Sequence, residues 1–320
     1  MARFRLARPM IATLMVAAIA CTACVRAGPL RSPGGAAAGG DTVERHLSLG
    51  GADRSYLLLD DGAAGKPAPL VIALHGGGGN GATMVPRWAD KARAEGIVVA
   101  FPNGLGRMAR VGTWNAGGCC GYAMSEGVDD VAFVRAVIDD VARARPIDPS
   151  RIYVTGMSNG AMLTHRVAIA LSDRIAGAAI VAGALFGDEA PPKSPVPVLI
   201  MHGVKDQVVG FDGGMSPMSF VSRAQRKPFL PVTKAVDFWV KADGCATPLV
   251  STPPGEVTVQ RWSCPGGGEV VFYRLASATH MWPGATNTVS LLETTPYTAV
   301  NATDVVWDFF KRHQRALPNR

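Results

Sequence analysis

The sequence has 320 residues, of which 48% are hydrophobic and 18% are charged. This composition is that of a globular chain with a large core, and it excludes a protein that is disordered over most of its length. The formal net charge is +7, but the first 27 residues contain four Arg and no acidic residue, so the remainder carries only +3. Such a small excess does not indicate a nucleic-acid-binding protein.

The N-terminal segment, residues 1–27, has the pattern of a signal peptide. Three Arg residues precede an apolar stretch at 10–20, which is too short to span a bilayer and predicts no transmembrane segment. Small residues at 25–27 fit cleavage after Ala27. The run at 18–21 also resembles a bacterial lipoprotein box, which would place a lipid anchor on Cys21. Both processing alternatives stay open.

Export predicts a periplasmic or extracellular protein in which disulfides can form. Residues 28–42 are rich in Gly and Ala and predict a flexible linker. We expect a single catalytic domain over residues 43–317, since the chain shows no internal repeat and no long low-complexity tract.

Strands and helices alternate along this domain. Residues 43–49 and 55–60 mix polar and apolar side chains, as a partly exposed hairpin does. Further strands are expected at 69–74, 97–101, 151–155, 176–181, 196–201 and 269–275, and helices at 83–95, 128–144, 161–171, 233–241 and 301–313. This order predicts an α/β fold with a mostly parallel central sheet and helices on both faces.

A nucleophile motif lies between the strand at 151–155 and the helix at 161–171. Residues 156–160 read Gly-Met-Ser-Asn-Gly, the pattern G-x-S-x-G. A chain with 37 Gly produces such a pattern by chance, but here the strand, the turn and the helix of a nucleophile elbow are all present. We therefore predict that Ser158 is a nucleophile.

A serine hydroxyl needs a base, and the base needs an acid that orients it. In this type of fold the chain order is Ser, acid, His. His280 follows the last expected strand and is the predicted base. Asp206 follows the preceding strand and is the favoured acid, with Asp212 in the same connection as the alternative. His202 is interpreted as a residue that shapes this loop.

The oxyanion of an acyl-transfer intermediate requires backbone N–H donors. One is expected from Asn159, directly after the nucleophile. The other is expected from the glycine run at 76–79, with Gly77 as first choice and Gly78 as second. The Lys and Ser or Thr of a phosphate-binding loop do not follow this run. We predict no metal ion and no organic cofactor.

Seven motifs together resemble the secreted polyhydroxybutyrate depolymerase and feruloyl esterase group of α/β-hydrolases. They span about residues 53–313 and lie at 74–79, 101–104, 114–121, 128–133, 156–160, 202–206 and 280–284. The resemblance implies an α/β-hydrolase fold and a triad of Ser158, Asp206 and His280. One departure is Thr279, where members of the group often have Gly.

The resemblance predicts a serine esterase whose partner is a small, oligomeric or polysaccharide-linked ester. We expect soluble short-acyl or aryl esters to be cleaved faster than crystalline polyester. Trp282, two residues after His280, is predicted to contact substrate. The segment 211–231, with Met215, Met218, Phe220 and Phe229, is a candidate for an apolar wall beside Asp206. The alternatives are a peptidase with the same triad and a binding protein that retains the fold without catalysis.

Four Cys lie beyond the N-terminal segment. Cys245 and Cys264, nineteen positions apart between the acid and the base, are predicted to form a disulfide. Cys119 and Cys120 are adjacent, and the choice between free thiols and a vicinal pair stays open.

Overall fold

The structure, a computed structural model, describes residues 42–246, 250–285 and 296–317. These residues belong to one compact unit. The predicted signal peptide and all but the last residue of the predicted linker lie outside the described residues. No described helix combines the length and the apolarity that a membrane span requires.

Twelve strands are described. They are β1 (Val43–Leu49), β2 (Ala52–Asp60), β3 (Ala68–Leu74), β4 (Val98–Pro102), β5 (Leu105–Met108), β6 (Val111–Thr113), β7 (Ile147–Met157), β8 (Gly177–Val181), β9 (Val198–Gly203), β10 (Val250–Ser251), β11 (Val257–Ser263) and β12 (Glu269–Leu275). The helices are α1 (Val85–Glu95), α2 (Gly121–Ser125), α3 (Asp130–Ala144), α4 (Asn159–Ala170), α5 (Ser219–Ser222), α6 (Val232–Ala242) and α7 (Ala302–Phe310), with 3-10 turns η1 (Gly81–Thr83) and η2 (Pro265–Gly267).

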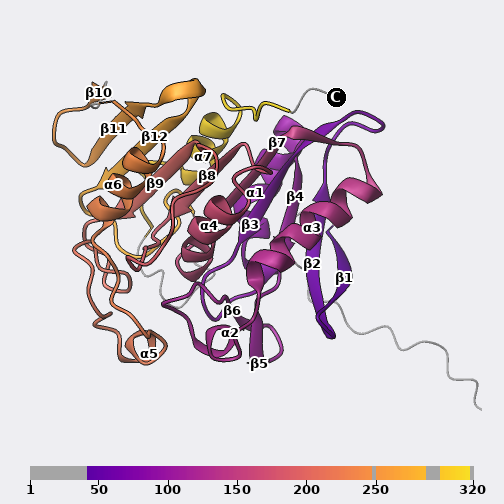
Figure 1. Cartoon of the computed structure of the whole chain (residues 1–320), viewed down its shortest axis with the longest axis horizontal. Coiled ribbons are helices and arrows are strands. Elements are labelled where there is room, and N and C mark those ends of the chain that lie inside the picture. The colour runs from indigo at the N-terminus through magenta and orange to yellow at the C-terminus, as the bar shows by residue number, and fades with distance from the viewer. Residues whose placement is uncertain (1–41, 247–249, 286–295, 318–320) are drawn as a thin grey trace, which may run out of the picture. The chain divides into compact units, whose positions relative to one another are not determined.

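Ten of these strands form one sheet in the order β1-β2-β4-β3-β7-β8-β9-β12-β11-β10. The six strands from β4 to β12 are parallel, and antiparallel strands extend the sheet at both edges. The expected hairpin, mostly parallel sheet and flanking helices are all present (Figure 1). The predicted α/β fold is therefore confirmed.

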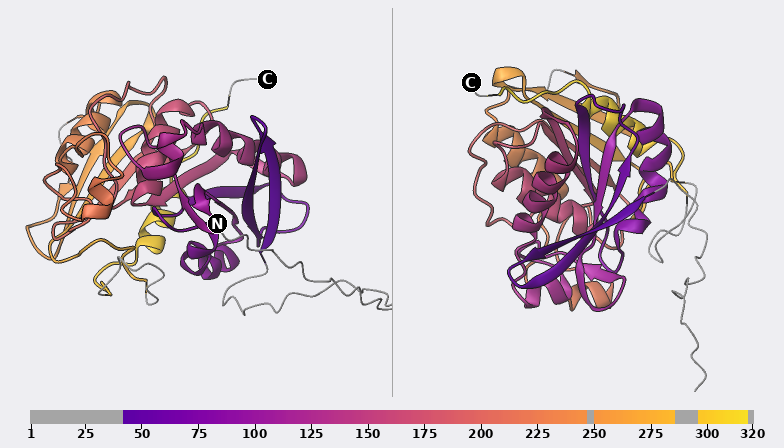
Figure 2. Two further views of the ribbon diagram at one scale, coloured as in Figure 1. Left: turned by 90° about the horizontal axis from the view of Figure 1, so that it is seen from below. Right: turned by 90° about the vertical axis from the view of Figure 1, so that its right-hand side faces the viewer.

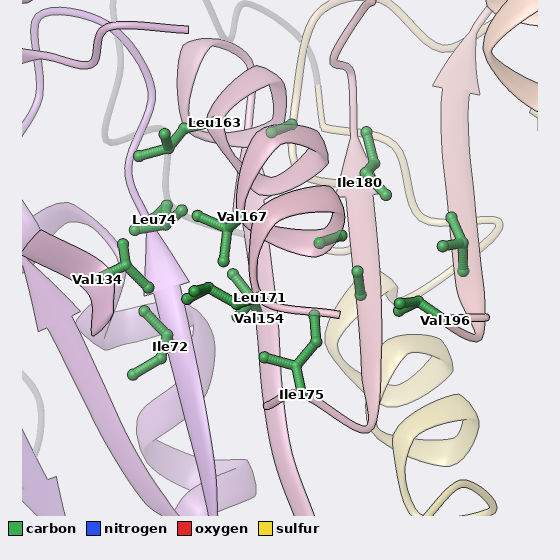
Figure 3. Close-up of a cluster of buried hydrophobic side chains, with 14 of the residues drawn as sticks. Ile72, Leu74, Val134, Val154, Leu163, Val167, Leu171, Ile175, Ile180 and Val196 are labelled. Carbon is green, nitrogen blue, oxygen red and sulfur yellow. The ribbon is translucent and has the colours of Figure 1, made fainter. Parts of the chain in front are cut away.

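The two faces of the sheet are covered by different helices (Figure 2). Alternate strand residues point to opposite faces, and they divide into two apolar cores. One core joins the sheet to α3, α4 and α6, and the other joins it to α1 and α7. Figure 3 shows Leu163 and Val167 of α4, and Leu171 directly after it, packing against the first face. The helix that follows Ser158 is thereby anchored in the core.

Two long excursions leave the carboxyl ends of the parallel strands. The first follows β4 and contains β5, β6 and α2, and the second follows β9 and contains α5. They join where Cys119 pairs with Gln225 and where the N–H of Arg226 donates to the Gly118 carbonyl at 2.8 Å. In parallel sheets ligands bind at this edge, so the excursions build the walls of the candidate site.

Candidate active site

Ser158 occupies a sharp turn between β7 and α4. Its backbone has φ 55° and ψ −124°, an unusual conformation for a residue other than Gly. A Cβ at Gly156 would overlap the backbone of Gly160, and a Cβ at Gly160 would overlap the His75 carbonyl oxygen. The two glycines therefore allow the strand, the turn and the helix to approach one another closely. This is the strand–turn–helix arrangement expected of a nucleophile elbow.

The acid and base that were expected from the sequence lie in contact. Nδ1 of His280 is 2.8 Å from Oδ2 of Asp206. The other carboxylate oxygen accepts the N–H groups of Val208 and Val209, each at 2.8 Å. Burial alone would raise the pKa of Asp206, but His280, His202 and their hydrogen bonds outweigh it and hold the pKa well below its usual range. Asp206 is therefore ionised at neutral pH, as an orienting acid must be.

His202 is a further contact of the acid that the sequence interpretation missed. Its Nε2 lies 2.8 Å from the Val209 carbonyl oxygen and 3.3 Å from Oδ2 of Asp206. Since a carbonyl oxygen only accepts, Nε2 carries the proton. That proton faces the carboxylate as well, so His202 helps to hold Asp206. Its position at the end of β9, four residues before the acid, was the only signal in the sequence.

Ser158 and His280 line the same cavity, which has a volume of about 530 Å³. Both are buried, with 9% and 2% of their surface exposed. Nε2 of His280 has no hydrogen-bond partner in the part of the chain that the structure describes. It is thus available to a proton from the serine side, and such contacts often tighten only when substrate binds.

The glycine run beside Ser158 favours Gly77 over Gly78 as an oxyanion donor. The N–H of Gly78 already donates to the Gly112 carbonyl at 2.8 Å. The N–H of Gly77 has no acceptor among the described residues, and Gly77 lines the cavity. Asn159 is the first residue of α4, so its N–H also has no acceptor within the helix.

Hydrogen bonds of His75 and Trp114 hold this glycine run in place. The N–H of Gly104 donates to Nε2 of His75 at 2.9 Å, so Nδ1 carries the proton and donates to the Gly76 carbonyl at 2.7 Å. Burial lowers the pKa of His75 to about 4, which keeps the ring neutral. The indole N–H of Trp114 donates to the His75 carbonyl at 2.8 Å. The loop is therefore fixed by buried groups.

Ser158 also lines a second, apolar cavity of about 260 Å³. Its side chains come from both excursions and from α4, and include Thr113, Cys120, Met162, Val209 and Phe220. Of the expected apolar wall, Met218 and Phe220 line the first cavity, and Phe220 lines this one as well. Ser158 thus lines two cavities, one of which is mostly apolar.

The structure does not bring Trp282 to the nucleophile. Its side chain is 2% exposed, its indole N–H donates to Oγ1 of Thr303 at 3.0 Å, and it belongs to the core beneath α7. It is absent from the residues that line either cavity at Ser158. The expectation of substrate contact, based on its closeness to His280 in sequence, is therefore not carried further.

Cys245 and Cys264 are joined by a disulfide, as are Cys119 and Cys120. The first bond ties the end of α6 to the β11–β12 hairpin. The second lies in the wall of the apolar cavity, because Cys120 is among its lining residues. The described residues contain no group of three or more His, Cys, Asp or Glu that could hold a metal ion.

Comparison with known proteins identifies the family. The profile described as "Esterase PHB depolymerase" matches residues 54–223, more than half of the chain. The chain belongs to this family. The esterase family profile covers Ser158, Asp206 and the glycine run, and it ends before His280.

Among individual relatives, the chain is 33% identical to feruloyl esterase B of Piromyces equi over 64% of this chain and 38% of that one. It is 30% identical to feruloyl esterase C of Emericella nidulans over 55% of this chain and 63% of that one. The chain thus spans less than two thirds of each of these relatives.

Among solved structures, the acetyl xylan esterase from Aspergillus awamori superposes with a TM-score of 0.56 at 15% identity, over 84% of this chain and 99% of that one. At this identity the match concerns the fold alone, and it agrees with the α/β-hydrolase arrangement described above.

Proposed function

We propose that this esterase-family protein is an exported serine hydrolase of carboxylic esters that acts through Ser158, His280 and Asp206. The observation that carries the proposal is the pairing of His280 with Asp206 at 2.8 Å, beside a cavity that Ser158 and Gly77 also line. Ser158, His280 and Gly77 line one cavity and Asp206 contacts His280, and this grouping supports acyl transfer.

In the proposed reaction, Nε2 of His280 accepts the Ser158 proton while Oγ attacks the ester carbonyl carbon. The N–H groups of Gly77 and Asn159 stabilise the oxyanion. The imidazolium donates the proton to the oxygen of the leaving alcohol as the C–O bond of the ester breaks. The alcohol departs, and the acyl group remains on Ser158 as an acyl-enzyme. Water then attacks this ester in the same manner and releases the acid. Asp206 stays ionised throughout and stabilises the imidazolium.

The proposed substrates are soluble aryl or short-acyl esters, including hydroxycinnamoyl and oligomeric hydroxyalkanoate esters. Support comes from the two cavities at Ser158, which offer a place for each side of an ester bond, and from the names of the relatives. The chemistry would proceed without a metal ion or an organic cofactor.

A fluorophosphonate probe tests the nucleophile, since it labels activated serines covalently. We expect labelling at Ser158 in the native chain and none in Ser158→Ala. Hydrolysis of matched aryl butyrate ester and anilide substrates then distinguishes an esterase from a peptidase. Failure of the native chain to be labelled would favour a binding protein that retains the fold, and faster anilide cleavage would favour the peptidase.

A further inference from the structure

A third depression, next to the apolar cavity, runs along the surface of both excursions. It has a volume of about 590 Å³ and shares Thr113, Phe220 and Ala224 with the apolar cavity. We call it the basic groove. Its principal lining side chains are Arg107, Met108, Tyr122, Phe220, Arg223 and Arg226. An extended molecule bound at Ser158 through the apolar cavity would continue into this groove.

The charges in the basic groove are of one sign. Arg107, Arg223 and Arg226 are all exposed, and none has an ion-pair partner among the described residues. No Asp or Glu lines the groove; the nearest acidic residue in sequence is Glu126, at the exposed end of α2. Three other exposed Arg, at 93, 143 and 312, are paired with carboxylates. The groove therefore presents unpaired positive charge beside the catalytic site.

Apolar surface accompanies this charge. Met108 is 67% exposed and Phe220 is 49% exposed, and both line the groove. The ring of Tyr122 is half-buried in the groove, with the Arg107 guanidinium 5.7 Å from its centroid. Flat apolar side chains between cations suit a ligand that has both an apolar face and anionic groups.

We propose that the basic groove binds the chain of a carboxylate-bearing polysaccharide whose ester is cleaved at Ser158. Three arginines along the groove match carboxylates that recur along a chain, as on successive uronic acid units. A hydroxyalkanoate oligomer carries one carboxylate, at one end, and would satisfy a single arginine. This inference rests on the proposed esterase function for its substrate, but the groove's selectivity is measurable by binding alone.

Binding is tested by calorimetry on the Ser158→Ala variant, which cannot turn over an ester. The ligands are trigalacturonate, neutral xylotriose and the hydroxybutyrate trimer. Each exposed ion pair contributes about twofold, so three together contribute about tenfold. We expect trigalacturonate to bind about tenfold more tightly than xylotriose in 50 mM salt, and the preference to shrink in 500 mM salt because exposed charges are screened.

The decisive variant is Arg107→Gln combined with Arg223→Gln and Arg226→Gln. It should abolish the preference for trigalacturonate and leave hydrolysis of a neutral aryl butyrate within about twofold. The matched control is Arg135→Gln, which removes one exposed charge from α3 and should change neither. Equal binding of trigalacturonate and xylotriose, or unchanged trigalacturonate binding in the triple variant, overturns the inference.

Two further outcomes are distinguishable. Arginine-dependent binding of the hydroxybutyrate trimer without binding of trigalacturonate overturns the assignment to a polysaccharide. If the protein binds trigalacturonate through these arginines but hydrolyses no ester, the groove's proposed ligand is supported and the proposed esterase function is wrong. If the protein hydrolyses neutral esters but shows no preference for acidic chains, only the proposed role of the basic groove is wrong.

Discussion

The side-chain amide of Asn159 forms two hydrogen bonds with the backbone of Trp114. Its Oδ1 accepts the Trp114 N–H at 2.7 Å, and its Nδ2 donates to the Trp114 carbonyl at 3.0 Å. The residue after the nucleophile is therefore fastened to the first excursion, and that excursion holds the glycine run through His75. One side chain thus couples the two proposed oxyanion donors.

We expect Asn159→Ala to lower both stability and turnover. The substitution leaves the buried N–H of Trp114 without a partner, while the Trp114 carbonyl keeps the Cys120 N–H at 3.2 Å, so the expected cost is roughly 1–3 kcal/mol of unfolding free energy. It also frees the peptide that carries an oxyanion donor, so kcat for an aryl ester should fall about tenfold or more. Denaturant unfolding and steady-state kinetics measure these effects.

The matched control for Asn159→Ala is Asn301→Ala, which removes the N-cap of α7. It should reduce stability by about 1 kcal/mol without changing kcat. Equal kcat in the native chain and in Asn159→Ala would show that this side chain does not position the donors.

Substitutions in the proposed triad should separate Asp206 from Asp212. Ser158→Ala and His280→Ala are expected to reduce turnover by on the order of a millionfold, and Asp206→Asn by about ten-thousandfold. Asp212 is exposed, and Asp212→Asn should leave activity near the native value. Near-native turnover in Asp206→Asn together with a loss in Asp212→Asn would mean that the acid has been misassigned.

Asp243 should make stability depend on pH. It is 3% exposed, and its Oδ1 accepts the Val196 N–H at 3.3 Å. Burial raises its pKa to about 7. Between the unfolded value near 4 and about 7, the folded state binds more protons than the unfolded one, so this group's contribution to stability falls as pH rises, by up to about 1.4 kcal/mol per pH unit.

Denaturant unfolding at pH 5 and pH 8 checks this dependence. Relative to the native chain, Asp243→Asn should lose less stability on going from pH 5 to pH 8. Asp237→Asn, an exposed substitution on the same helix, should retain the native pH dependence. Identical pH profiles for all three proteins would contradict the assignment.

The Cys245–Cys264 bond should contribute to stability through the loop that it closes. With a separation of 19 residues, the expected loss in the double variant Cys245→Ala/Cys264→Ala is roughly 3 kcal/mol. Mass spectrometry of unreduced peptides checks the pairing independently. A peptide linking Cys245 to Cys119 or Cys120 would contradict it.

Much of the sheet could be predicted because its strands are unbroken apolar runs that are buried on both faces. Among the elements missed by the sequence interpretation, the strands β5, β6 and β11 lack this signal, since most of their residues are only partly buried or exposed. Each pairs with a neighbour in the chain, β5 with β6 and β11 with β12, but their mixed polar and apolar residues do not mark them as strands.

The same difference holds at the candidate site. The placement of Ser158 follows from a local strand–turn–helix pattern, so sequence sufficed to find the elbow. The contact between His202 and the acid depends on how the loop at 204–209 folds back, and the preference for Gly77 depends on Gly112 accepting from its neighbour. Trp282 was misplaced because closeness in sequence to His280 does not fix the direction in which a loop side chain points.

The close packing of Gly156 and Gly160 has a consequence for reading other sequences. Both glycines are required by neighbouring backbone, Gly160 and His75 respectively, and neither requirement involves the Ser158 hydroxyl. A homologue that had exchanged the serine would still need both small residues to keep its strand against its helix. Across a set of homologues, the outer glycines would therefore mark the shared architecture, while the central residue would separate hydrolases from relatives that have become receptors or scaffolds.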